Sequence, residues 1–78
     1  MDKIGYREMV RGIESAYINK VIDDFVLKDR DKEIIKLNLL HGISYTNIPD
    51  KLENWVSTRT VQNVMNTWMP LILEHLKR

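Results

Sequence analysis

Apolar residues recur at steps of three or four along most of this chain, and no long stretch alternates between apolar and polar residues. Steps of three and four place side chains on one face of an α-helix, whereas strict alternation is typical of a strand. The pattern therefore predicts an all-α fold, a single small domain of four to five helices over residues 1–78.

The first predicted helix covers residues 3–27. Its apolar stripe consists of Tyr6, Met9, Val10, Ile13, Tyr17, Val21 and Phe25, and Ile18 and Ile22 widen it towards a second face. Gly12 lies inside this helix, where a glycine costs about 1 kcal/mol relative to alanine. A stripe this wide can pack within the domain or form a homodimer, and both uses stay open.

The second predicted helix runs from about residue 32 to residue 41, after a cluster of charged residues at 28–32. Asp29 or Asp31 is expected to cap its amino end, where a carboxylate also suits the helix dipole. Gly42 follows the last turn, and a glycine there can take the left-handed conformation that ends a helix.

Two short amphipathic segments follow, each preceded by a serine that can cap a helix, Ser44 and Ser57. The third helix begins either at Ser44 or as late as Ile48, since a proline such as Pro49 is tolerated only in the first turn. The fourth begins at Ser57, and Pro70 either kinks it or ends it before a C-terminal helix at 70–78. Two short helices with a tight joint predict a helix-turn-helix region at 32–69.

In a helix-turn-helix the second helix presents side chains to the major groove of DNA. Arginine can bond two acceptors of guanine, and asparagine or glutamine can pair with adenine, so polar residues off the apolar stripe of this helix are candidates for base contact. Hydroxyls and charges near the helix ends are candidates for phosphate contact. The predicted DNA-binding residues are Ser44, Tyr45, Lys51, Thr58, Arg59, Thr60, Gln62, Asn63 and Asn66, while Trp55 and Trp68 are expected in the core.

The segments KEIIKLNLLHGISYTNIPDKL and VSTRTVQNVM resemble region 4 of bacterial sigma factors and related small phage regulators. The matching residues are Gly42-Ile43-Ser44-Tyr45 before the first helix of the motif and Ser57-Thr58-Arg59-Thr60-Val61 at the start of the recognition helix. Similar sequences occur in late transcription regulators of the ArpU type and in small terminase subunits. The chain departs from the pattern at Ile48-Pro49 and in a turn two residues longer, without the usual glycine. The resemblance implies transcription regulation by DNA binding.

Composition limits the chemistry and the partners. The chain has no cysteine, only two histidines far apart and no clustered carboxylate partner for them, which argues against a metal site, a cofactor and catalysis. Residues 1–43 carry eight basic and eight acidic residues, and residues 44–78 carry four and three. DNA affinity depends largely on neutralising phosphates, so a chain this neutral is expected to act as a homodimer or attached to RNA polymerase.

No secretory signal or transmembrane run is evident, which predicts a cytoplasmic protein. The leading hypothesis is a DNA-binding transcriptional regulator. The alternatives are a small terminase-like subunit that recognises DNA for packaging, and a protein-interaction module or inhibitor that has the same shape but does not bind DNA.

Overall fold

The computed structural model describes residues 6–52 and 56–76, and within these ranges the chain is helical with no strand. This confirms the all-α prediction. Five helices follow one another along the chain: α1 (Tyr6–Met9), α2 (Ser15–Phe25), α3 (Asp29–Leu39), α4 (Ile48–Lys51) and α5 (Thr58–Leu76). Among the described residues, none of these helices combines the length and the apolarity needed to cross a membrane.

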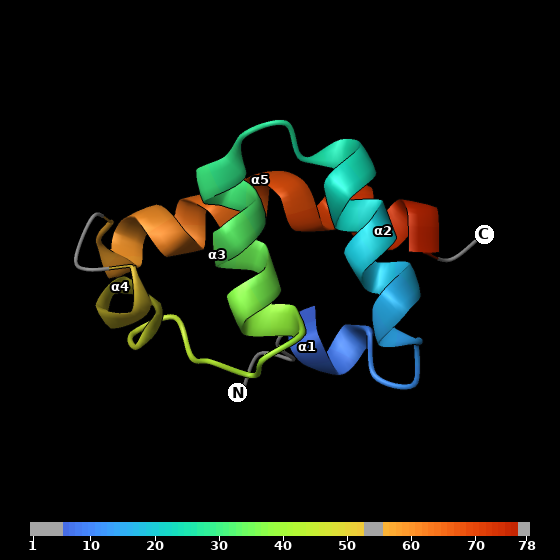
Figure 1. Ribbon diagram of the computed structural model, residues 1–78, viewed down its shortest axis with the longest axis horizontal. Coiled ribbons are helices and arrows are strands. Elements are labelled where there is room, and N and C mark those ends of the chain that lie inside the picture. The colour runs from blue at the N-terminus through green and yellow to red at the C-terminus, as the bar shows by residue number, and fades with distance from the viewer. Residues whose placement is uncertain (1–5, 53–55, 77–78) are drawn as a thin grey trace.

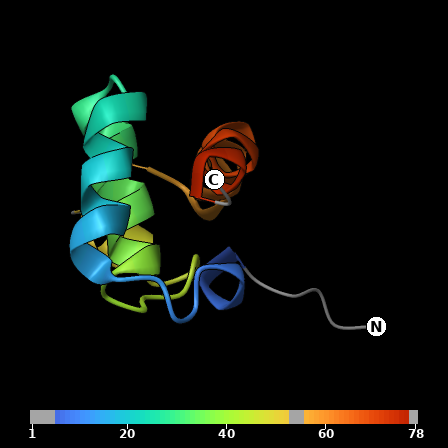
Figure 2. The same cartoon turned by 90° about the vertical axis from the view of Figure 1, so that its right-hand side faces the viewer.

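The helices form two layers. Helices α2 and α3 lie side by side and antiparallel, and the long helix α5 crosses both of them (Figure 1). Seen along α5, α2 and α3 make one layer and α5 makes the other, with α1 beside it (Figure 2). The short helix α4 packs at the amino end of α5 and also contacts α3 (Figure 1). One side of α5 therefore faces the core and the other faces away from it.

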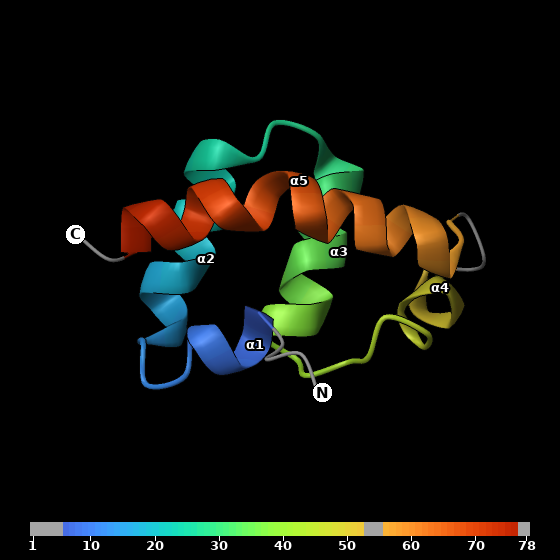
Figure 3. The same ribbon diagram turned by 180° about the vertical axis from the view of Figure 1, so that it is seen from behind.

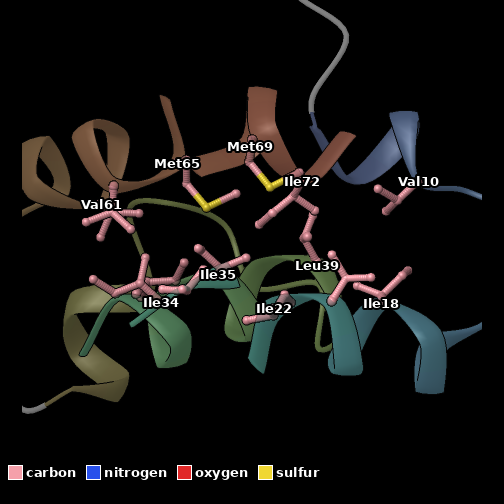
Figure 4. Packing of buried hydrophobic residues seen from close by; sticks show 14 of the residues in the cluster. Val10, Ile18, Ile22, Ile34, Ile35, Leu39, Val61, Met65, Met69 and Ile72 are labelled. Atoms are coloured by element: carbon pink, nitrogen blue, oxygen red, sulfur yellow. The ribbon is translucent and has the colours of Figure 1, made fainter. Parts of the chain in front are cut away.

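The core lies between the two layers (Figure 4). From α5 it receives side chains at steps of three and four, which is the spacing that buries one face of a helix. Isoleucines of α2 and α3 face them from the opposite layer. The largest side chains with almost no exposed surface are Ile22, Ile34, Ile35, Ile48, Met65, Met69 and Ile72.

The prediction of one continuous helix over residues 3–27 is wrong within the described residues. Helix α1 ends at Met9, and Gly12 has φ +88°, a left-handed conformation that glycine adopts at little cost and other residues avoid. The chain turns there and α2 begins at Ser15. The break changes which residues share a face: Ile18 and Ile22 are buried, whereas Met9 and Tyr17 are 48% and 40% exposed. The apolar stripe therefore does not run along a single helix, and its use in a homodimer stays a prediction.

Helix α3 begins at Asp29 rather than near residue 32, and neither aspartate caps it with a side-chain hydrogen bond. Its carboxyl end agrees with the prediction: Gly42 has φ +70°, and the Ile43 amide donates to the Leu37 carbonyl, 3.0 Å. Lys36 joins α3 to α2 through a 2.8 Å ion pair with Asp23. The hydrogen bond from Lys36 holds the pKa of the Asp23 carboxyl below its usual value.

The two prolines differ in their effect. Helix α4 begins at Ile48 with Pro49 in its first turn, which confirms the later of the two predicted starts. Pro70, however, does not end the fourth predicted helix, because α5 continues to Leu76. The separate C-terminal helix predicted at 70–78 is therefore wrong, with residues 77–78 outside the described ranges. Pro70 lies on the exposed side of α5, where the carbonyl that it leaves without a donor can meet water.

Candidate nucleic-acid interface

Helices α3, α4 and α5 all contact one another, which is the arrangement that a helix-turn-helix requires. Ile35 of α3, Ile48 of α4 and Val61 of α5 have no exposed surface and belong to one apolar cluster. Val56, just before α5, is also buried, while Trp55, which was expected in the core, lies outside the described residues. The apolar cluster fixes the amino half of α5 against the two helices behind it.

Ser57 caps α5 as predicted. Its Oγ accepts a hydrogen bond from the Thr60 amide, 3.1 Å, and lies 3.1 Å from the Thr60 hydroxyl. Thr58 and Thr60 are both half-buried. The Thr60 hydroxyl therefore has a partner within the cap.

Four of the predicted residues lie together on the side of α5 that faces away from the core, and we call them the polar face of α5: Arg59, Gln62, Asn63 and Asn66. All four are exposed, while Val61, Val64 and Met65 of the same turns are buried. Neither α2 nor α3 covers this side of α5. In Figure 3, α5 crosses in front of both helices. The polar face presents one guanidinium and three amides to solvent on a single rigid helix.

Tyr6 of α1 bonds one of the predicted residues, Asn66. Its hydroxyl donates a 3.1 Å hydrogen bond to Oδ1 of Asn66. It also lies near Tyr45, whose pKa is raised by burial of its phenol and, to a lesser extent, by Tyr6. Tyr45 packs half-buried against the apolar core rather than standing free for phosphate. The sequence pattern assigned Tyr6 only to a packing stripe, because nothing in it signals a contact across 60 positions.

Ser44 and Lys51 lie in a different part of the surface. Both line a hollow with Gly42, Ile43, Asn47 and Asp50, and no described residue of α5 lines it. The Ser44 hydroxyl lies 3.2 Å from that of Thr46, and Lys51 is exposed at the end of α4. The structure therefore groups these two residues apart from the polar face of α5.

A buried carboxylate links α3 to α5. Asp31 is 6% exposed, and its Oδ2 accepts a 3.1 Å hydrogen bond from the indole nitrogen of Trp68. Its Oδ1 accepts two hydrogen bonds from the Arg30 guanidinium, each 3.2 Å. Trp68 was predicted in the core, and it does pack half-buried against it. The bond to Asp31 therefore joins α5 to α3 in addition to their apolar contacts.

Replacing Trp68 by phenylalanine is expected to lower the free energy of unfolding by about 1–3 kcal/mol, because Oδ2 of the buried Asp31 loses its donor. Urea unfolding of Trp68→Phe, Asp31→Ala and the double variant measures the coupling directly. We expect a coupling energy of about 1 kcal/mol or more, within the range of contacting residues. Additive effects of the two substitutions would show that the bond does not contribute.

Within the described residues, no group of histidine and carboxylate side chains could hold a metal ion. His75, near the end of α5, packs its ring edge against Phe25 of α2, with ring centroids 4.8 Å apart. His41 is exposed just after α3.

Comparisons of the chain with protein-family models, with curated proteins and with solved structures found no match. A functional assignment therefore depends on the geometry of α5 and the helices around it.

Proposed function

We propose that this protein is a transcriptional regulator that binds duplex DNA by placing the amino half of α5 in the major groove. The observation that carries the proposal is the polar face of α5, which is exposed along the first turns of a helix held from behind by α3 and α4. A recognition helix needs this combination of a rigid support and free side chains near its amino end.

The side chains of the polar face suit base recognition. Arg59 can donate two hydrogen bonds to O6 and N7 of guanine, and Gln62 and Asn63 can each pair with N6 and N7 of adenine. Solvated helix faces more often carry lysine and glutamate, whose helix propensity is better than that of asparagine. A face with three amides and one guanidinium is therefore better explained by recognition than by solubility.

The low charge predicts how the protein reaches its site. The chain has a formal net charge of +1, and the polar face holds a single cation. Few phosphates can be neutralised, so binding by one copy is expected to be weak and to depend little on salt. We propose that the protein acts as a homodimer or attached to RNA polymerase, either of which supplies the missing affinity.

Selection from a random pool of duplex DNA tests the proposed function. The purified protein is expected to enrich a short motif at low salt, and raising the salt concentration should weaken binding with a shallow slope. A pool carried through the same cycles without protein is the control. No binding even at low salt would contradict the proposed function and direct the search towards a protein partner.

A further inference from the structure

We propose that Tyr6 of α1 limits the base-reading surface of α5 to Arg59, Gln62 and Asn63 by holding the side-chain oxygen of Asn66. The inference rests on the proposed function and adds a specificity-determining residue outside the helix-turn-helix. The Tyr6 hydroxyl donates a 3.1 Å hydrogen bond to Oδ1 of Asn66.

Adenine recognition by asparagine uses both ends of the amide at once. Oδ1 accepts from N6 of the base while Nδ2 donates to N7. In this structure the Tyr6 hydroxyl already donates to Oδ1 of Asn66. Because the phenol holds Oδ1, the amide of Asn66 cannot turn to align both of its ends with a base unless this hydrogen bond breaks.

Packing against the core holds the Tyr6 ring in place. Tyr6 is half-buried and packs against the apolar core, so its ring is held while its hydroxyl reaches α5. Helix α1 lies in the same layer as α5 and flanks it, as Figure 2 shows. Gly12 directs the chain from α1 back into α2, which positions α1 beside α5 rather than in line with α2.

The next exposed side chains of α5 after Asn66 offer little to a base. The Thr67 hydroxyl donates back to the Asn63 carbonyl, 2.8 Å, and Pro70 and Leu71 carry no hydrogen-bonding side chain. The helix rises about 1.5 Å per residue, so the distance along α5 from Arg59 to Asn63 is about 6 Å, or roughly two base-pair steps. Contact by Asn66 would add about one base-pair step. Tyr6 therefore decides whether α5 reads the DNA motif over two base-pair steps or over three.

Selection from random duplex DNA with four variants tests the inference: Tyr6→Phe, Asn66→Ala, the double variant, and Tyr17→Phe as a control. Tyr6→Phe keeps the packed ring and removes only the hydroxyl. Tyr17 is an exposed tyrosine of α2, in the other layer. Circular dichroism establishes that each variant is folded before selection.

We expect Asn66→Ala and Tyr17→Phe to enrich the same motif as the original protein. Tyr6→Phe should add one position with a roughly five- to 150-fold preference for adenine, the discrimination typical of a two-bond contact. The double variant should lose that added position. This last result would assign the new preference to Asn66 rather than to a general change in the fold.

Two results would overturn the inference while the proposed function stands: a motif altered by Asn66→Ala alone, or an unchanged motif in Tyr6→Phe. The first would mean that Asn66 contacts a base despite Tyr6, and the second that releasing Asn66 adds nothing. Failure of every folded variant to bind DNA would instead overturn the proposed function, and this inference with it.

Discussion

Replacing Ile22 by alanine is expected to lower the free energy of unfolding by about 2–5 kcal/mol, the range found for removing a large aliphatic side chain from a closed core. Ile22 of α2 has no exposed surface and lies between the two layers of helices (Figure 4). For a chain of this length the total stability is on the order of 4–12 kcal/mol. The substitution should therefore remove a large share of it.

Urea unfolding followed by the helical circular dichroism signal measures this effect. Leu27→Ala is the matched control, because it deletes an aliphatic side chain of the same size at a position that is 83% exposed. We expect that control to change stability by less than about 0.5 kcal/mol. Equal effects at the two positions would show that α2 does not pack against α5 as described.

The second large effect is expected at Arg59. If the polar face of α5 reads bases, Arg59→Ala should weaken binding to the selected motif by about 1–3 kcal/mol, five- to 150-fold, and remove the preference for guanine at one position. The polar face has no other cation to compensate, because its remaining members are amides. Fluorescence anisotropy with the selected duplex, and with a duplex altered at the guanine, measures both quantities.

Two control variants separate charge from geometry. Lys20→Ala removes an equal charge from an exposed position of α2, in the layer away from the polar face, and should leave specificity unchanged. Arg59→Lys keeps the charge but loses the planar fork that bonds two acceptors of guanine. We expect Arg59→Lys to lose specificity as Arg59→Ala does. If Lys20→Ala and Arg59→Ala weaken binding equally, Arg59 acts only through charge and base recognition by α5 is wrong.

The periodicity of the apolar residues predicted the helical class, and three local signals at helix ends were accurate, although the expected aspartate cap of α3 was not. Gly42 ends α3 in the left-handed conformation, Ser57 caps α5, and Pro49 occupies the first turn of α4. Each of these depends on a residue and its immediate neighbours, so it can be recognised without knowing the fold.

The errors came from glycine and proline inside helical patterns. Gly12 was treated as a cost within one helix, yet its positive φ divides α1 from α2 and changes which residues face the core. Pro70 was predicted either to kink the helix or to end it, and α5 does not end there but continues to Leu76. Local preference allows either outcome at such positions, and packing of the flanking segments decides between them.

In the candidate site, too, some features follow from the local sequence and others only from packing. The pattern alone placed Arg59, Gln62 and Asn63 off the apolar stripe, because the register of a capped helix follows from its own sequence. It did not foresee that Tyr6 would bond Asn66 or that Trp68 would bond the buried Asp31, 60 and 37 positions away. Those contacts exist only once the two layers have packed. The sequence thus determined the helical class and the polar face of α5, and the tertiary structure decided where the chain breaks between helices and which side chains of the polar face are free.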